Sequence, residues 1–342
     1  MSKTYAGRFF EDYAPGQVIE HAVPRTVTAG ERALYHALYP ARHALYSSDA
    51  FAQSCGLPAA PLDDLAAFHV VFGKTVPDIS LNAVANLGYA EGRWRASVWP
   101  GDTLRAVSEV IGVKQNSNGK SGVVWVRTRG LNQDGVAVLE YVRWVMVRKR
   151  DPEAPAPETV IPDLAPAVAA DDLVVPPGLD FTGYDVTLAG EPHRWGDYEI
   201  GEQIDHVDGV TVEEAEHMMA TRLWQNTAKV HFDATLRPDG QRLIYGGHVI
   251  SLARALSFNG LANAQLIAGL NAGAHANPCF AGDTVRAWSE VLDKAETAAP
   301  GVGALRLRLV ATKGAPFELK GDDGKYLPDV LLDLDYWVLM PV

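Results

Sequence analysis

Cysteine is nearly absent from this chain, which has only Cys55 and Cys279 among its 342 residues. Two isolated cysteines cannot form a disulfide framework, and neither belongs to a metal-binding spacing, so we predict no metal site. Long apolar runs are absent as well: the opening MSKTYAGRFFEDYAPG has no apolar segment, and no run of about 18 apolar residues follows. The sequence therefore predicts a cytoplasmic protein with no membrane partner.

Basic residues are fewer than acidic residues in this chain. The chain has 30 Lys and Arg against 42 Asp and Glu, which gives a formal net charge of -12. Such a surface repels polyphosphate, so we predict no nucleic-acid partner. A local basic pocket for one phosphorylated ligand stays compatible with this balance. Hydrophobic residues make up 47% of the chain, which is enough to bury a core of ordinary size.

Motifs of several enzyme classes are missing too. Residues 73–75 (GKT) and 119–121 (GKS) resemble the end of a phosphate-binding loop, but Phe68 and Lys114 stand where the first glycine is required. The sequence contains no GxGxxG, HExxH or GxSxG pattern. Nucleotide hydrolysis, zinc proteolysis and α/β-hydrolase chemistry therefore lose support.

The strongest positive feature is an internal repeat. Residues 101–110 (GDTLRAVSEV) and 282–291 (GDTVRAWSEV) are identical at eight of ten positions and lie 181 residues apart. The pattern DYxxGxxIxH occurs at 12–21 and again at 197–206, which are 185 residues apart. Two nearly equal separations indicate a duplicated domain rather than a solenoid, whose periods are shorter.

The repeat divides the chain into two domains, residues 1–150 and 186–342, joined by a linker at 151–185 rich in proline and alanine. Such a linker favours extended backbone over a packed core. Each copy has a helical segment (29–38 or 212–223), then an apolar helix (63–72 or 248–258), then β-rich segments joined by turns. The pattern predicts an α+β fold in which an antiparallel sheet wraps around one buried helix in each half.

The two copies differ in the loop before the apolar helix. A shift of 185 residues pairs Tyr46 with His231, Ala41 with Asn226, and Ser48 with Asp233. The second copy therefore carries an Asn-x-x-x-x-His-x-Asp set where the first has only Ala, Tyr and Ser. Because only the second copy keeps titratable residues in this loop, we predict a single active site per chain.

This order of features resembles the MaoC-like hydratases and dehydratases. That family has a loop of the form Asp-x-Asn-Pro-x-His-x-Asp, then a buried helix, then a Pro-Gly-Asp-Thr turn. Here His231, Asp233 and the Gly-Asp-Thr turns at 101–103 and 282–284 match in order. The resemblance implies a tandem double hot-dog fold and the reversible hydration of an enoyl-CoA thioester. One departure is that Asn226 occupies the slot of the family's catalytic Asp.

Two longer stretches narrow the resemblance. Residues 71–94 (VFGKTVPDISLNAVANLGYAEGRW) and 7–17 (GRFFEDYAPGQ) are similar to the branch of the family that interconverts mesaconyl-CoA and β-methylmalyl-CoA. The resemblance therefore implies a hydro-lyase whose partner is an acyl-CoA and which needs no cofactor, because CoA is part of the substrate.

We assign the chemistry to the second copy. His231 would carry the proton transfers, since a histidine pKa of about 6.5 lies close to working pH. Asn226 would hold the water, and Asp233 would orient the imidazole or act as a second base. Gly247 is our candidate donor to the thioester oxygen, because backbone N–H groups at a helix start favour negative charge. The neighbouring residues Tyr245, Gly246 and His248 would contact the substrate.

The first copy would supply binding surface for the acyl-CoA. Arg93 or Arg95 would meet a substrate carboxylate or a CoA phosphate, although a role in the core or at the rim is an equal alternative. His275 is interpreted as a structural strand residue. The other first-copy candidates are Ala60, Pro61, Leu62, Asp63, Asn86, Leu87, Gly88, Tyr89, Ser97, Val98 and Trp99.

Other functions stay open at this point. A general (R)-specific enoyl-CoA hydratase or a hot-dog thioesterase would share the fold, and a non-catalytic acyl-CoA-binding protein is a third alternative. A thioesterase would need a carboxylate placed at the thioester carbon, which the loop at 226–233 suits less well than hydration. Further association into a homo-oligomer is compatible with such a fold.

Overall fold

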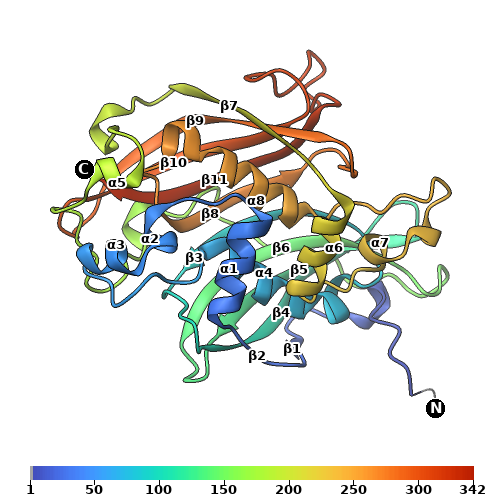
Figure 1. The fold of residues 1–342 in the computed structure, drawn as a ribbon. Coiled ribbons are helices and arrows are strands. Elements are labelled where there is room, and N and C mark those ends of the chain that lie inside the picture. Colours follow the sequence, from blue (N-terminus) through green and yellow to red (C-terminus); the bar gives the residue numbers. More distant parts are fainter. Residues whose placement is uncertain (1–2) are drawn as a thin grey trace.

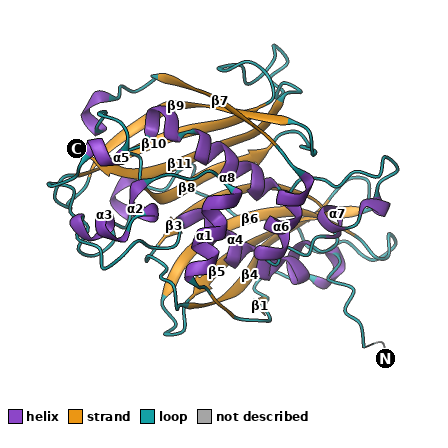
Figure 2. Ribbon diagram, viewed as in Figure 1, coloured by secondary structure: helices purple, strands orange, loops and turns teal. Residues whose placement is uncertain are grey.

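The structure is a computed structural model and describes residues 3–342. Its centre is one 11-stranded antiparallel sheet with the order β1-β4-β5-β6-β3-β8-β11-β10-β9-β7, and β2 pairs with β4 outside this path. Helices gather on one side of the sheet, as Figures 1 and 2 show. The predicted antiparallel sheet around buried helices is therefore what the chain forms.

Both copies contribute strands to this sheet. Those of the first half are β1 (Val18–Glu20), β2 (Arg25–Thr26), β3 (Ala83–Trp94), β4 (Thr103–Gln115), β5 (Ser121–Leu131) and β6 (Ala137–Arg148). Those of the second half are β7 (Gln203–Thr211), β8 (Leu266–His275), β9 (Thr284–Glu296), β10 (Val302–Thr312) and β11 (Val330–Pro341).

The helices are mostly short. The α-helices are α1 (Ala29–Leu38), α2 (Ala44–Ser47), α3 (Asp49–Ser54), α4 (Asp64–Thr75), α5 (Val186–Ala189), α6 (Glu214–Leu223), α7 (Lys229–Phe232), α8 (Gly246–Leu256) and α9 (Phe258–Leu261). A π-helical turn, η2 (Val76–Ser80), extends α4, and 3-10 turns lie at η1 (Phe10–Asp12), η3 (Ala170–Asp172), η4 (Trp195–Asp197) and η5 (Ala234–Leu236). Among residues 3–342 no helix is long and apolar enough to cross a membrane.

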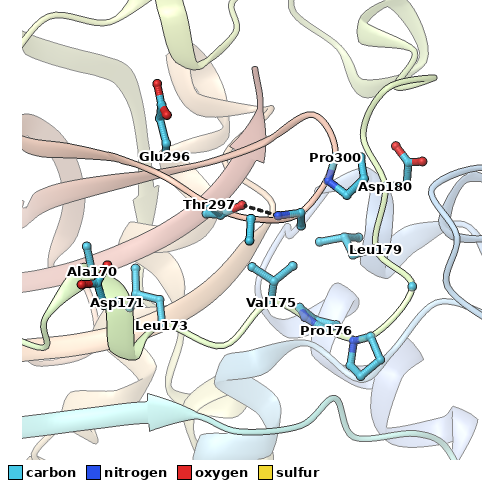
Figure 3. A pocket seen from close by; sticks show the side chains of 14 residues that line it. Ala170, Asp171, Leu173, Val175, Pro176, Leu179, Asp180, Glu296, Thr297 and Pro300 are labelled. Carbon is cyan, nitrogen blue, oxygen red and sulfur yellow. Dashed lines mark hydrogen bonds between the residues drawn. The ribbon is translucent and has the colours of Figure 1, made fainter.

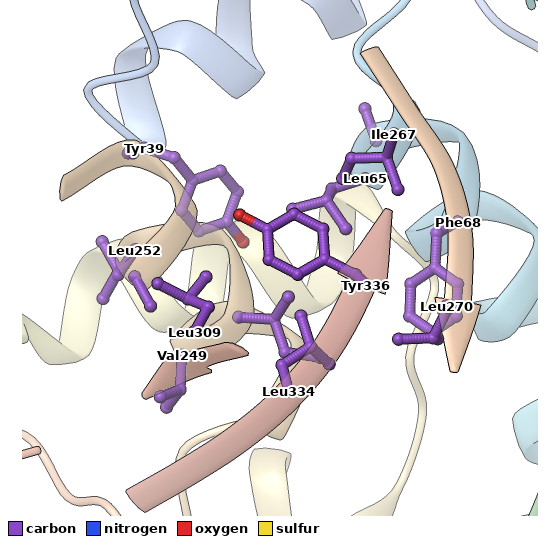
Figure 4. Packing of buried hydrophobic residues seen from close by; sticks show 14 of the residues in the cluster. Tyr39, Leu65, Phe68, Val249, Leu252, Ile267, Leu270, Leu309, Leu334 and Tyr336 are labelled. Atoms are coloured by element: carbon purple, nitrogen blue, oxygen red, sulfur yellow. The ribbon is translucent and has the colours of Figure 1, made fainter. Parts of the chain in front are cut away.

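The two halves meet along β3 and β8, which pair with Tyr89 opposite Gly273 and Arg93 opposite Gly269. The central helices α4 and α8 are buried against this continuous sheet. Every residue of α4 is buried, and most of them are apolar. One hydrophobic cluster includes Phe68 of α4, Val249 of α8 and Leu270 of β8 (Figure 4). The core therefore belongs to both halves at once.

The segment 151–185 is irregular but not loosely attached. It contains η3 and one isolated bridge, between Val160 and Val113. Leu179, Phe181 and Tyr184 are each less than 5% exposed and join a second hydrophobic cluster with α2 and α3. The expectation of an unpacked linker is wrong in this respect, because apolar residues after the prolines reach the sheet.

Candidate active site

A cavity of about 270 Å³ lies between the two halves of the chain. The first half contributes α4, η2, β3 and β6, and the second contributes the loop around α7, the start of α8 and the end of β8. Its polar and aromatic lining residues are Phe72, Ser80, Asn86, Tyr89, Arg143, Asn226, His231, Tyr245, His275, Asn277 and Cys279. The cavity therefore brings the polar loop of the second copy against the sheet of the first.

His231 is fixed by its own loop. Its Nδ1 lies 2.7 Å from the carbonyl oxygen of Leu243, so Nδ1 carries the proton and donates it. Nε2 is then the basic nitrogen of the neutral ring, and it makes no hydrogen bond to the described residues. Burial lowers the pKa of His231 to about 4. The pKa of His231 thus departs from the ordinary histidine value of about 6.5, because the ring is withdrawn from water.

Asn226 lines the same cavity and is 1% exposed. Gln225 before it adopts a left-handed backbone with φ of 55°, and the Asn226 N–H donates to the Thr221 carbonyl at the end of α6. The Asn226 side-chain oxygen accepts from the backbone N–H of Ala228 at 3.2 Å. This turn holds the carboxamide in the cavity that His231 lines, as the loop comparison predicts.

Asp233 does not take part in this arrangement. Its Oδ1 accepts from the Thr235 backbone N–H at 2.9 Å and from the Thr235 hydroxyl at 2.6 Å. The carboxylate caps η5, and these hydrogen bonds lower its pKa. The prediction that Asp233 orients the imidazole is wrong. The Leu243 carbonyl accepts the hydrogen bond from His231 Nδ1, and Asp233 bonds Thr235 instead.

The start of α8 faces the cavity through Tyr245 and Gly246. The first N–H groups of a helix have no partner within the helix, and the Gly246 and Gly247 N–H groups bond to no described residue. A Cβ on Gly246 would lie 2.4 Å from the His275 ring, so only glycine fits there. Gly246 lines the cavity and Gly247 does not. Gly246 therefore becomes the candidate N–H donor to the thioester oxygen.

His248 lies behind this helix start rather than in the cavity. It is fully buried, and its Nδ1 is 3.1 Å from the hydroxyl of Tyr39 on the first half. The expected substrate contact of His248 is therefore wrong. The Tyr39 hydroxyl also accepts from the Trp224 indole N–H at 3.3 Å, so His248 belongs to a polar contact between the halves.

His275 lies in the cavity, although the sequence suggests a structural strand residue. Its Nε2 is 3.1 Å from the Tyr89 hydroxyl, so the contact crosses from β8 to β3. Burial lowers the pKa of His275 to about 4. Nothing in the local sequence around this histidine distinguishes a cavity position from a core position, because the pairing of β8 with β3 decides it.

Most of the first-copy candidates lie away from the cavity; only Asn86 and Tyr89 reach it. The equivalent helix start is closed, because the Tyr46 hydroxyl donates to Asp64 at 2.5 Å where the second copy has His231. Asp63 caps α4 by accepting from the Leu65 N–H. The other candidates do not line this cavity, and their expected contact with the acyl-CoA stays a prediction: these are Ala60, Pro61, Leu62, Leu87, Gly88, Arg93, Arg95, Ser97, Val98 and Trp99.

Arg93 illustrates the reason. It pairs with Asp172 of the segment between the halves at 3.1 Å and also bonds the Glu91 carbonyl, so its charge is already balanced. Gly88 packs under the Trp144 indole, where a Cβ would lie 2.3 Å from the ring. Because side chains alternate along a strand, only part of residues 86–99 can face one cavity.

Arg143 is the residue that sequence reasoning missed. It is 0% exposed and lines the cavity from β6. Its guanidinium lies 4.2 Å over the Phe72 ring and donates to the Thr75 hydroxyl at 2.7 Å. No Asp or Glu pairs with it among the described residues. An arginine inside the apolar run VLEYVRWVMV is a signal that could have identified it.

A larger cavity of about 670 Å³ lies against the segment between the halves (Figure 3). Its charged lining residues are Asp171, Asp180 and Glu296, with no basic group among the described residues that line it. Three carboxylates repel a CoA phosphate, and no histidine lines this cavity to move a proton. The smaller cavity is therefore the candidate active site. Residues 3–342 also contain no group of His, Cys, Asp and Glu that could hold a metal ion.

Comparison with known proteins shows the family of the chain. Residues 2–315 match the family model described as mesaconyl-CoA hydratase. The chain belongs to the mesaconyl-CoA hydratase family. It is 80% identical to the mesaconyl-CoA hydratase of Cereibacter sphaeroides over 341 residues, covering 99% of both chains. It is 60% identical to the β-methylmalyl-CoA dehydratase of Chloroflexus aurantiacus over 349 residues, again with 99% of both covered.

Solved structures support the same family. A MaoC domain protein dehydratase from Chloroflexus aurantiacus has a TM-score of 0.97 and 59% identity, covering 100% of this chain and 99% of that one. A double hot-dog protein from Mycobacterium tuberculosis has a TM-score of 0.76 and 25% identity, with 98% of both chains covered. The predicted MaoC-like family, the double hot-dog fold and the hydro-lyase class are confirmed.

Proposed function

We propose that this member of the mesaconyl-CoA hydratase family interconverts mesaconyl-CoA and β-methylmalyl-CoA, with His231 as its acid–base group. One observation carries the assignment of the site. His231 donates through Nδ1 to the Leu243 carbonyl and thereby presents a basic Nε2 in a cavity at the start of a buried helix. The names of the two curated relatives support the choice of substrate.

In the proposed reaction His231 Nε2 removes a proton from a water that the Asn226 carboxamide holds. The water oxygen bonds to the β-carbon of the enoyl thioester, and the electron pair of the double bond moves to the thioester oxygen as an enolate. The Gly246 N–H, at the positive end of α8, stabilises that oxygen. His231 then returns its proton to the α-carbon, so that one water has been added and the histidine is neutral again.

The low pKa of His231 suits both steps. Because the ring is neutral in the ligand-free site, it is ready to accept a proton. Once protonated it is a strong acid, which favours delivery of the proton to the α-carbon. A thioesterase is less well supported, since the cavity contains no Asp or Glu among the described residues to attack or activate water at the thioester carbon.

The test is an assay of enoyl-thioester absorbance with mesaconyl-CoA, run beside an assay for free thiol. We expect the absorbance to fall without thiol release. Release of thiol would indicate a thioesterase, and tight binding without turnover would indicate an acyl-CoA-binding protein; either result contradicts the proposal. The absence of a cofactor, a cytoplasmic location and association into homo-oligomers stay predictions.

A variant pair tests the site itself. His231→Gln keeps an amide that can donate to the Leu243 carbonyl but removes the basic nitrogen, so we expect kcat to fall by about 10²–10⁴-fold. The matched control is His193→Gln, because His193 is exposed and does not line the cavity. Full activity of His231→Gln would show that the proton transfers occur elsewhere.

A further inference from the structure

The first half of the chain places one permanent charge in the active-site cavity. Arg143 is completely buried, and its guanidinium is held by hydroxyl groups and an aromatic face: Thr75 at 2.7 Å, Ser80 at 3.4 Å and the Phe72 ring at 4.2 Å. Its Nε makes no hydrogen bond among residues 3–342. No carboxylate of those residues forms an ion pair with it.

A buried charge without a counter-ion is expensive. Withdrawing an ammonium- or guanidinium-sized ion from water costs several kcal/mol even after relaxation, and neutral hydroxyl groups recover only part of this. An arginine cannot lose its proton to escape that cost, since a guanidinium is always protonated in proteins. The described residues therefore leave a positive charge in the cavity unbalanced, and an anionic ligand group would neutralise it.

A second unpartnered group lies in the same cavity. Asn86 of β3 lines it, and both the oxygen and the nitrogen of its carboxamide are buried without a hydrogen bond of ordinary geometry to the described residues. Strands β3 and β6 are paired, with Asn86 opposite Val145 and Tyr89 opposite Arg143. Strands β6 and β3 thus place the Arg143 guanidinium and the Asn86 amide in the cavity, and both groups have polar atoms without a hydrogen bond of ordinary geometry to the described residues.

Arg143 and His231 line the same cavity, and two aromatic rings lie between them. The Phe72 ring under Arg143 packs 5.7 Å from the Tyr245 ring, and the Tyr245 ring lies 5.8 Å from the His231 ring. A cavity of about 270 Å³ accommodates only a short acyl group. Such a group, with its reacting carbons at His231, would present its far end to Arg143.

We propose that Arg143, assisted by Asn86, binds the free carboxylate of a dicarboxylic acyl-CoA and makes the site selective for such substrates. This assignment rests on the proposed hydratase function for the reaction but concerns a different residue and a different half of the chain. A guanidinium binds a planar carboxylate through two parallel N–H donors, which fixes orientation as well as charge. The second half performs the proton transfers, and the first half recognises the acyl end.

The experiment compares Arg143→Met and Arg143→Lys with two substrates, mesaconyl-CoA and tiglyl-CoA, in which a methyl group replaces the free carboxylate. We expect Arg143→Met to lower kcat/KM for mesaconyl-CoA by about 100-fold or more, which corresponds to about 2.7 kcal/mol at 1.36 kcal/mol per tenfold. For tiglyl-CoA the change should stay within about threefold. Arg143→Lys should lie between wild type and Arg143→Met, because it keeps the charge but loses the paired donors.

Arg148→Met is the matched control, since Arg148 lies on the same strand and is exposed. Equal losses with both substrates in both Arg143 variants would overturn the proposal, and so would unchanged activity with mesaconyl-CoA. A binding measurement separates this proposal from the proposed reaction. Wild type should bind succinyl-CoA at least tenfold more tightly than butyryl-CoA by calorimetry, and Arg143→Met should abolish that preference.

These readouts fail independently. If wild type does not hydrate mesaconyl-CoA yet prefers succinyl-CoA through Arg143, the reaction is wrong and the carboxylate site stands. If wild type hydrates mesaconyl-CoA but Arg143→Met retains the preference for succinyl-CoA, the reaction stands and the assignment of Arg143 is overturned.

Discussion

His231 and Arg143 respond to burial in opposite ways. The histidine can give up its proton, and burial holds its pKa at about 4, so the ring enters the cavity as a neutral base. The arginine cannot, and it remains a cation without a carboxylate partner in the described chain. A single cavity thereby offers a neutral base on one wall and a fixed positive charge on the other.

Arg143→Met should leave the ligand-free protein as stable as wild type, or more stable. Methionine keeps much of the volume and the contact with Phe72 while removing the cost of the buried charge, and such replacements are often neutral or stabilising by about 1–4 kcal/mol. Thr75 keeps its hydrogen bond to the Phe72 carbonyl at 2.7 Å. Thermal unfolding without ligand measures this.

Arg306→Met is the comparison for that measurement. Arg306 of β10 forms two hydrogen bonds with Asp335 of β11, at 2.9 and 2.6 Å, so its loss leaves a partly buried carboxylate with the Asn271 amide but without a counter-ion. We expect this variant to unfold at a lower temperature than wild type. If Arg143→Met also unfolds at a clearly lower temperature than wild type, Arg143 contributes to the stability of the fold and is not reserved for ligand binding.

The pH dependence of the reaction should report the low pKa of His231. Since the neutral ring is the base, kcat/KM should stay level from about pH 8 to pH 5 and fall by tenfold per pH unit below about pH 4. Rapid pH-jump assays with tiglyl-CoA measure this without the titration of a substrate carboxylate. A midpoint near pH 6.5 would contradict it, because the ring would then be hydrated in the working enzyme.

At the scale of elements, the start of α8 is the most constrained part of the site. The His275 ring lies over Gly246, and the Tyr245 ring lies against Gly247, in each case 2.4 Å from where a Cβ would stand. On the first copy, Gly73 of α4 approaches the backbone of Trp224 so closely that a Cβ would lie 1.8 Å from its carbonyl oxygen. Gly73 of the GKT segment therefore allows α4 to pack closely against the backbone of Trp224, just before the loop of Asn226 and His231.

Gly246→Ala should therefore reduce activity more than stability. The added methyl group must displace His275, which narrows the cavity and disturbs the contact with Tyr89, while overpacking of this kind costs about 1–3 kcal/mol of stability. We expect kcat/KM to fall at least tenfold in a variant that still unfolds cooperatively. Gly183→Ala is the control, because no atom lies within 4 Å of the place where its Cβ would stand. Equal activity of the two variants would refute the assignment.

The sequence predicts these elements unevenly. It places the first helix at 29–38, and that helix forms at Ala29–Leu38, where the Thr28 side chain caps it. It places the buried helices at 63–72 and 248–258, but they form at Asp64–Thr75 and Gly246–Leu256. The start of α4 follows from its N-cap Asp63, whereas the start of α8 has no side-chain cap.

At the scale of the whole molecule, the interior is unusually rich in buried histidine. Burial lowers the pKa of six histidines to about 3 or 4; these are His69, His206, His217, His231, His248 and His275. Two buried carboxyls shift the other way, since burial raises the pKa of Asp63 to about 6 and that of Asp64 to about 7.

Stability should accordingly fall as pH drops from about 6.5 toward 4. In that range the unfolded chain binds protons at these histidines and the folded chain does not, so protonation favours unfolding by up to about 1 kcal/mol per histidine and pH unit. Asp63, Asp64 and Glu191, whose pKa burial raises, act in the opposite direction. They are three against eight histidines, because burial lowers the pKa of His36 and His43 as well. Urea midpoints at pH 7.5, 6.5 and 5.5 measure the slope.

His69→Gln is the variant for that measurement, because glutamine can keep a hydrogen bond to Ser251 but does not titrate. Its urea midpoint should fall less between pH 6.5 and 5.5 than that of wild type. A stability that rises toward pH 5.5 in wild type would mean that the buried carboxyls outweigh the histidines.

The sequence by itself determined the duplication, the family and the loop that holds Asn226 and His231. These follow from order along the chain, which a repeat and a motif record directly. Only the tertiary structure decided that Asp233 caps η5, that His275 meets Tyr89, and that Arg143 stands unpaired in the cavity. Which strand residues face one cavity, and whether a charge finds a partner, depends on the pairing of β3 with β6 and β8, and that pairing joins segments far apart in the chain.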